Sequence, residues 1–377
     1  AQAALRASAF AFEALVGGAV GMQPSPGGDG RELQRAGLPP SMVAIMETQV
    51  EELRRALHRF KVCNQASGPG AEVVAAAGAA SVPGHADILV FGPSGSGKSS
   101  LIRTFYMALN NCTDVPQDVS ERIIVKDKQM NEGTLKYVSA VVKPARVDHR
   151  GVTVSSAIMC HDTRGHIWMD DREQRQLGIM LDGSVKDDSL VHQRNFRYAR
   201  LLWEFWKRDI DLFPSEILVK RASIQTQPHA LLFVFDGSMD EIPDGDEETK
   251  FYREIIQMSR DKGYSYPQVV LTRIDRVEEN LMKKGGICDS SELELQLRQV
   301  LDRKIEDVVA RLDVSRTSVH FVENYHAGGT WAEGRNVSVD FHALKILSQC
   351  CSHADAFVYE SLRRTSTSMR QPACGLQ

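Results

Sequence analysis

A loop rich in glycine and serine, Gly92 to Ser99, has the residue spacing of a phosphate-binding loop. The apolar run Asp87 to Phe91 predicts a buried strand before it, and Lys98 to Leu109 has a helical period. Glycines let the backbone turn its N–H groups inward, and the helix N-terminus adds positive potential. The lysine would reach the β- and γ-phosphates of a nucleotide, and the next serine would ligate Mg²⁺. Nucleotide contacts are therefore expected from Gly92, Ser94, Gly95, Ser96, Gly97, Lys98, Ser99 and Ser100.

A carboxylate and a glycine follow the next β-rich run, in the order Asp162-Thr-Arg-Gly165. At the carboxyl end of a strand, Asp162 would hold Mg²⁺ through water and the Gly165 N–H would contact the γ-phosphate. A triphosphate would then order the following segment, and hydrolysis would release it. His166 stands where many nucleotide hydrolases orient the attacking water, which makes it a catalytic candidate with Lys98. The alternative is an exposed loop histidine, with hydrolysis that is slow or depends on a partner.

A threonine that contacts Mg²⁺ and the γ-phosphate is expected before Asp162, at a distance that leaves room for two antiparallel strands. Thr153 lies only nine positions before Asp162, which at ~3.3 Å per residue suffices for one strand. Thr134 lies 28 positions before Asp162 and leaves enough chain for both strands. We therefore predict Thr134 as a catalytic and metal-binding residue, with Ser99 and Asp162 as the other metal ligands, and Thr153 as a strand residue.

The run Val269 to Asp275 predicts a buried strand that ends in Thr272-Arg273-Ile274-Asp275, a variant of the Asn/Thr-Lys-x-Asp element. The Asp275 carboxylate can accept hydrogen bonds from the N1–H and 2-amino groups of guanine, which adenine lacks. A wrong base would leave buried groups unpaired at a cost of about 1–3 kcal/mol each. Arg273 replaces the usual lysine, and its flat guanidinium could stack on the base. We therefore expect GTP or GDP, with Mg²⁺, as the ligands.

An aromatic-rich stretch at 196–206 lies in the long insert 166–229 and predicts a helix. Packing on the core is the simpler interpretation, but its position after Gly165 makes it the expected nucleotide-sensitive surface. A protein partner, or a second copy of the chain, would contact this helix and the switch region.

The composition excludes several other classes of protein. The formal net charge is −4 and the sequence pI about 6.3, so no broad positive field favours nucleic acid. Seven cysteines without a CxxC pair indicate neither a disulfide framework nor a zinc site, and point to a cytoplasmic location. No apolar run predicts a membrane span. Membrane attachment is expected only if Cys374, in the C-terminal Cys-Gly-Leu-Gln, is prenylated.

Apolar runs that alternate with helical patterns predict an α/β fold, a three-layer P-loop NTPase with a mainly parallel sheet, flanking helices and an N-terminal helix. Strands are expected at 87–91, 135–142, 152–160, 231–235, 269–271 and 318–322, and helices at 98–109, 248–262, 291–312 and 341–362. The expected organisation is a low-complexity lead-in at 1–40, an amphipathic helix at 41–62, a linker at 63–85, the nucleotide domain at 86–362 and a flexible tail at 363–377. The helix at 41–62 would dock on this domain or pair with a second copy.

With these motifs in place, residues 86–362 resemble the GTPase domain of the interferon-induced protein 44 family. The resemblance depends on Asp162 to Gly165, Phe233 to Asp236, Leu271 to Asp275, Met169 to Asp171, Leu177 to Gly183, Val322 to Tyr325, and the closing helix from Ala343 to Leu362. It implies a dynamin-like or Ras-like domain, a cytoplasmic location and a role in defence or growth restraint. It also places Asn324, followed by Tyr325, in the loop that closes over the base. The TLD-type domain of some members is not recognisable in residues 1–85, and His166 replaces their usual hydrophobic residue.

Two other functions remain open. A P-loop kinase or ATPase would use the same phosphate loop but has no need of Asp275. A scaffold would hold GTP as a structural ligand without turnover, whereas a slow GTPase would use it as a switch.

Overall fold

The computed structural model describes residues 40–64, 75, 78, 81–123, 136–163, 165–166, 169–190, 215–285, 290–325 and 335–370. All of them belong to one compact unit, Leu38–Gln377. Four features expected from the sequence lie outside the described residues: the lead-in at 1–39, Thr134, the aromatic stretch at 196–206 and Cys374.

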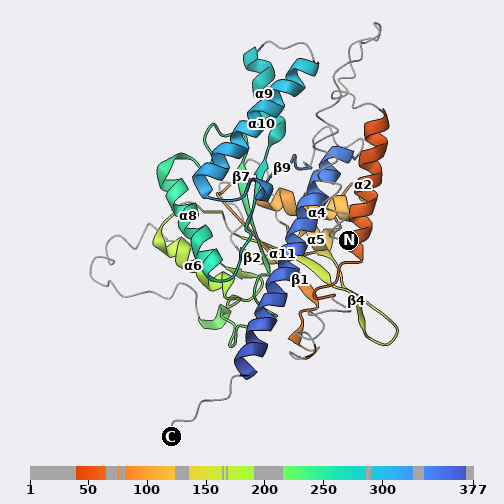
Figure 1. Cartoon of the computed structure of the whole chain (residues 1–377), viewed down its shortest axis with the longest axis vertical. Coiled ribbons are helices and arrows are strands. Elements are labelled where there is room, and N and C mark those ends of the chain that lie inside the picture. The colour runs from red at the N-terminus through yellow and green to blue at the C-terminus, as the bar shows by residue number, and fades with distance from the viewer. Residues whose placement is uncertain are drawn as a thin grey trace, which may run out of the picture. The chain divides into compact units, whose positions relative to one another are not determined.

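A central sheet positions the candidate site (Figure 1). Among the described residues it has seven strands, in the order β6-β2-β5-β1-β7-β8-β9. The five parallel strands are β1 (His85–Phe91), β5 (Ala157–Asp162), β7 (Ala230–Asp236), β8 (Gln268–Thr272) and β9 (Val319–Phe321). β2 (Lys136–Lys143) is antiparallel to β5 and to β6 (Ser189–Leu190). The parallel strands therefore end at one edge, where the motifs of the sequence gather.

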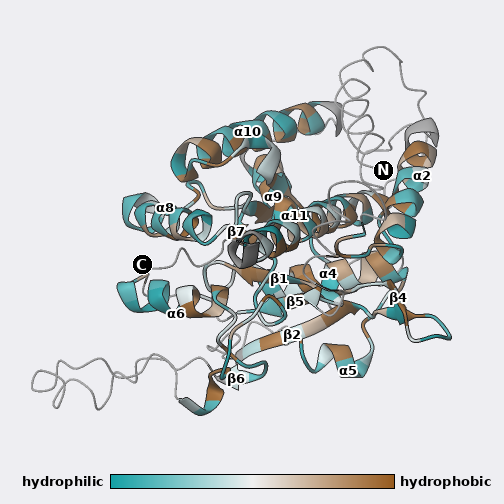
Figure 2. Ribbon diagram, turned by 60° about the horizontal axis from the view of Figure 1, so that its bottom comes forward, coloured by the Kyte–Doolittle hydropathy of each residue, from teal (hydrophilic) through white to brown (hydrophobic). Residues whose placement is uncertain are grey.

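Helices cover both faces of the sheet, which is why its central strands are apolar on both sides. Alternate residues of β1 illustrate this: Ile88 and Val90 pack on one side, Leu89 and Phe91 on the other. The first face is covered by α2 (Pro40–His58), α4 (Lys98–Asn110) and α11 (Val337–Arg370), the second by α6 (Asp171–Leu181), α8 (Gly245–Asp261) and α10 (Ser290–Leu312). Hydrophobic colour is concentrated on the strands and the inner helix faces (Figure 2). The predicted three-layer α/β fold is confirmed.

The amphipathic helix that begins near Ser41 is α2, and it docks on the main domain, the first of its two expected arrangements. Its apolar stripe joins the core formed with α4 and α11. Polar contacts fix the same arrangement: Arg54 Nε donates to the Ala108 carbonyl at 2.9 Å, and its Nη2 lies 3.5 Å from Asp340 Oδ2. The stripe is therefore buried within the chain.

The expected single strand at 152–160 is instead two strands. β4 (Thr153–Ser155) pairs with β3 (Arg146–Val147) in a separate hairpin, and β5 starts after Ser156. The break has a polar cause, because the Ser156 N–H donates to the Phe60 carbonyl at 2.9 Å and its hydroxyl accepts from the Val62 N–H at 3.0 Å. Thr153 is a strand residue, as predicted, but it belongs to β4, which precedes the end of β5 that is remote from Asp162.

Several elements differ from the sequence-based expectation. The helices α5 (Gln117–Ser120), α6 and α9 (Ile274–Gly285) and the short 3₁₀ turns η2 (Ser215–Ile217) and η3 (Arg316–Ser318) were not expected. The closing helix α11 is longer than predicted at both ends. None of the helices in the described part of the chain has the length and apolarity needed to cross a membrane.

Candidate nucleotide-binding site

The phosphate loop connects β1 to α4 at the carboxyl edge of the sheet. Its three glycines have positive φ: 152° at Gly92, 79° at Gly95 and 92° at Gly97. Space is restricted as well, because a Cβ on Gly92 would lie 2.1 Å from the Val234 carbonyl oxygen. The loop thus needs glycine for both its backbone conformation and its close approach to β7, and Ser100 follows it in the first turn of α4.

Lys98 occupies the centre of this loop. Its Nζ donates to the carbonyl of Gly92 at 3.0 Å and to that of Pro93 at 2.8 Å, and the residue is only 6% exposed. Burial lowers the pKa of Lys98 to about 8, although the charge of Asp162 acts in the opposite direction. A buried ammonium group at the start of a helix is suited to bind a phosphate.

Two oxygen ligands lie side by side next to Lys98. Ser99 lies at the start of α4, and Asp162 is the last residue of β5. The Ser99 hydroxyl donates to Asp162 Oδ2 at 2.5 Å. Mg²⁺ in nucleotide sites is bound by one or two protein oxygens together with phosphate and water oxygens. These two residues fit that role. Elsewhere in the described chain, no group of three or more His, Cys, Asp or Glu could hold a metal ion.

The segment after Asp162 lies directly against the phosphate loop. The Ser94 N–H donates to the His166 carbonyl at 3.1 Å, and the His166 N–H donates to the Gly92 carbonyl at 3.2 Å. A Cβ on Gly165 would come within 2.4 Å of Ser94 Cα, so only glycine fits. Gly165 is therefore beside the phosphate loop, as a γ-phosphate contact would require.

The His166 side chain does not take the position that its catalytic role requires. It is 8% exposed, its ring centroid lies 4.0 Å from that of Phe91, and it also packs against Phe251 and Tyr252. Its Nδ1 lies 3.2 Å from Glu173 Oε2 on α6. The imidazole is thus part of the core between the sheet and α8, and it could reach an attacking water only by leaving that core.

The Thr272 to Asp275 motif is bound to the phosphate loop. The Thr272 hydroxyl lies 2.6 Å from the Ser96 carbonyl and 3.2 Å from that of Phe235. Arg273 Nη2 donates to the Gly95 carbonyl at 2.5 Å, and Nη1 pairs with Asp236 at the end of β7. Two motifs 180 residues apart in sequence therefore meet at one site.

Arg273 is bound through its side-chain nitrogens in the ligand-free structure. Its guanidinium joins the phosphate loop to Asp236, and its stacking on a base stays a prediction. Asp275 follows in the first turn of α9, half-buried, and its carboxylate lies next to the N-terminus of that helix.

Asn324 belongs to the same cluster. Its Nδ2 donates to the Gly97 carbonyl at 3.3 Å, and its Oδ1 accepts from the Thr104 hydroxyl at 3.4 Å. The next residue, Tyr325, donates its N–H to the Thr104 hydroxyl at 3.0 Å. The loop after β9 is thus tied to the phosphate loop and α4. Thr104 and Glu173 are site residues that the sequence reading missed, since neither belongs to a motif.

Comparisons with known proteins give no family. No protein-family model matches the chain, and no curated protein matches its sequence. Among solved structures, Toc33 from Arabidopsis thaliana in complex with Mg²⁺ and GMPPNP is similar over 82% of this chain and 92% of its own, at 14% identity and a TM-score of 0.34. The signal recognition particle receptor complex SRb-GTP/SRX from Chaetomium thermophilum is similar over 64% of this chain and 92% of its own, at 15% identity and a TM-score of 0.27. At this sequence identity and TM-score, the structural similarity gives no information about what the chain binds or catalyses.

The fold itself defines the class. A mainly parallel sheet, with a glycine-rich loop between its first parallel strand and the following helix, is a three-layer α/β fold of the P-loop NTPase type.

Proposed function

We propose that this chain is a guanine-nucleotide-binding protein that uses Mg²⁺ and hydrolyses GTP slowly. The observation that carries the proposal is the direct bonding of the base-reading motif to the phosphate loop, through Thr272 to Ser96 and Arg273 to Gly95. One nucleotide can contact both motifs only if they are held together in this way. A kinase or ATPase would have no need of Asp275.

The phosphates would bind to the loop N–H groups, to the N-terminus of α4 and to Lys98. The ammonium group, now held by two loop carbonyls, would exchange these neutral partners for charged phosphate oxygens. Ser99 and Asp162 would bind Mg²⁺, with Thr134 as the third proposed ligand, and the ion would neutralise charge between the β- and γ-phosphates.

Slow hydrolysis follows from the position of His166. Catalysis needs a side chain that orients the attacking water, and this imidazole is packed among Phe91, Phe251 and Tyr252. The same observation favours a second candidate function, a GTP-binding scaffold without turnover. Phosphate release in a single-turnover assay separates the two.

A switch function would use the segment that starts at Gly165. Its two backbone hydrogen bonds to the phosphate loop would respond to the γ-phosphate, and the stretch at 196–206 would pass the change to a protein partner or a second copy. The resemblance to the interferon-induced protein 44 family adds a cytoplasmic, defence-related role to the proposal.

Nucleotide competition tests the proposal. A fluorescent GDP analogue should bind the full chain in the presence of Mg²⁺, and unlabelled GDP or GTP should displace it, whereas ATP at a hundredfold higher concentration should not. Lys98→Ala should abolish binding, because the phosphates lose their buried cation. The matched control is Lys283→Ala on α9, whose side chain is 73% exposed, and it should bind normally. Displacement by ATP with equal affinity would indicate an ATPase or kinase instead.

A further inference from the structure

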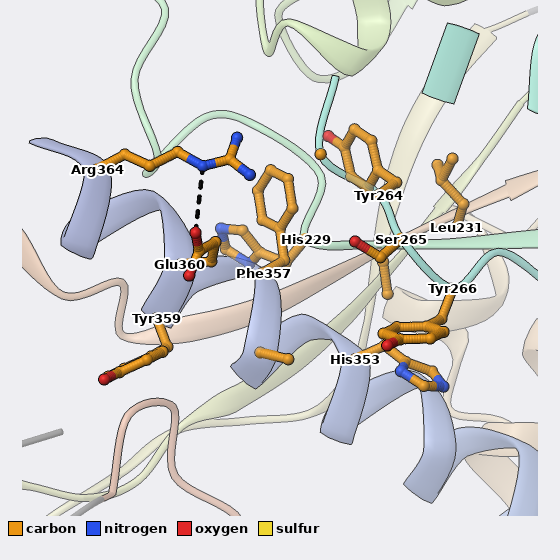
Figure 3. A pocket seen from close by; sticks show the side chains of 13 residues that line it. His229, Leu231, Tyr264, Ser265, Tyr266, His353, Phe357, Tyr359, Glu360 and Arg364 are labelled. Atoms are coloured by element: carbon orange, nitrogen blue, oxygen red, sulfur yellow. Dashed lines mark hydrogen bonds and ion pairs between the residues drawn. The ribbon is translucent and has the colours of Figure 1, made fainter. Parts of the chain in front are cut away.

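A cavity of about 400 Å³ lies at the amino end of the parallel strand β7, remote from the phosphate loop (Figure 3). Ala230 lines it at the start of β7, whereas Asp236 ends the same strand beside Arg273. Six residue steps of ~3.3 Å separate these two ends by roughly 20 Å. The cavity is therefore separate from the nucleotide site, and its size is typical of pockets that bind small organic molecules.

Aromatic rings form much of the cavity wall. Tyr264, before β8, stacks on Phe357 of α11 with ring centroids 4.5 Å apart and planes 10° apart. Tyr266 stacks in the same way on His353, at 5.3 Å and 26°, and is 60% exposed. Figure 3 shows both stacked pairs at the same cavity. Flat ring surfaces of this kind favour a ligand that is itself a planar ring.

The polar groups deep in the cavity are already engaged within the protein. His229 Nδ1 accepts from the Asp87 N–H at 3.1 Å, and its Nε2 donates to the Ile224 carbonyl at 2.7 Å. Burial lowers the pKa of His229 to about 4, so the ring is neutral. The Tyr264 hydroxyl lies 2.7 Å from the Pro228 carbonyl. Because these polar groups already have hydrogen-bond partners within the protein, the inner part of the cavity offers a ligand mainly flat ring surfaces.

Charge lies at the rim, on the last turns of α11. Both carboxylate oxygens of Glu360 accept from Arg363 at 2.8 Å. Arg364 makes one longer contact with Glu360, from Nε at 3.4 Å, drawn as the dashed line in Figure 3. Its Nη1 lies beside Gly263, 3.5 Å from where a Cβ on that residue would be. Glu360 and Arg364 are the charged residues that line the cavity, whereas Arg363 lies outside it. The Arg364 side chain is 65% exposed beside the aromatic wall.

We propose that this cavity binds a small planar aromatic monocarboxylate, with its ring against the stacked side chains and its carboxylate on Arg364. A guanidinium presents paired N–H donors that match the two oxygens of a carboxylate. Glu360, whose two oxygens bind Arg363, lies next to Arg364 and repels a second negative charge, so a monoanion fits better than a dianion such as a phosphate ester. This site does not depend on nucleotide binding.

The test uses the full chain and 2-naphthoate as the probe, titrated by calorimetry and by ligand-observed NMR. Two analogues separate ring from charge: 2-naphthamide keeps the ring and loses the charge, and cyclohexanecarboxylate keeps the charge and loses the aromatic ring. We expect saturable binding of 2-naphthoate and about tenfold weaker binding of each analogue. No saturable binding, or equal binding of the amide, would overturn the proposal.

Variants locate the site. Arg364→Gln and Tyr266→Ser should each weaken the binding of 2-naphthoate about tenfold. The control Arg298→Gln removes an exposed arginine of α10 and should leave this binding unchanged. All three variants should melt like the parent chain and bind GDP with unchanged affinity, because the nucleotide site is at the other edge of the sheet. If 2-naphthoate binding is unaffected by both cavity variants, the ligand binds elsewhere and the assignment is wrong.

Discussion

Exchange of Asp275 for asparagine should change which base the protein prefers. The carboxylate would accept hydrogen bonds from both the N1–H and the 2-amino group of guanine, whereas an asparagine amide turns an N–H₂ donor toward one of them. Xanthine has a carbonyl in place of the 2-amino group, so it offers this amide an acceptor. Asp275→Asn should therefore weaken the binding of GDP and strengthen the binding of xanthosine diphosphate.

The structure sets the size of the effect. Asp275 is half-buried in the first turn of α9, directly after the residues that bind the phosphate loop. Hydrogen bonds to a charged group contribute about 1.5–3 kcal/mol each, and asparagine retains at most one of the two. A loss of about 3–5 kcal/mol, counting the unpaired donor, corresponds to GDP binding that is roughly 150- to 4,500-fold weaker.

Titration calorimetry with GDP and xanthosine diphosphate measures both changes. Asp307→Asn, which changes an exposed carboxylate of α10, is the matched control and should bind like the parent chain. A thermal melt shows whether Asp275→Asn is folded. Unchanged GDP affinity in a folded Asp275→Asn chain would refute the assignment of this residue to base recognition.

Two further predictions concern Lys98 and His166. Burial holds the pKa of Lys98 at about 8, below the ordinary 10.5, and bound phosphate would raise it, so binding takes up a proton above pH 8. GDP affinity should be flat below pH 7 and fall by up to about tenfold per pH unit above pH 8; an affinity that rises with pH would contradict the buried cation. His166→Ala should lower the free energy of unfolding by about 2–4 kcal/mol, because it opens a cavity and leaves Glu173 without this partner, yet change the hydrolysis rate less than about threefold. Denaturant melts measure the stability and single-turnover assays measure the hydrolysis rate, with exposed His149→Ala as the control. A large loss of rate at unchanged stability would place the imidazole at the phosphates.

Local patterns were sufficient to predict the phosphate loop and the main strands. The run Asp87 to Phe91, the glycines after it and the helix that follows are each specified by neighbours in sequence, and the structure has all three. Helix α6 could also have been predicted, since Asp170 accepts from the N–H groups of Arg172 and Glu173 in an ordinary N-cap.

The roles of individual side chains depended on contacts between distant segments. The His166 ring packs against Phe251 and Tyr252 on α8, about 85 residues later in the sequence. No local sequence pattern predicts this contact. The partners of Arg273, Gly95 and Asp236, are likewise brought together only by the order of the strands.

Identification of the nucleotide retained by the purified chain tests the central claim most directly. The protein is purified in Mg²⁺, denatured, and its released small molecules are separated by chromatography. We predict GDP or GTP at close to one molecule per chain, and its loss in Lys98→Ala. Retention of an adenine nucleotide, or failure of the empty chain to take up added GDP, would contradict the proposal that one guanine nucleotide contacts both the phosphate loop and Asp275.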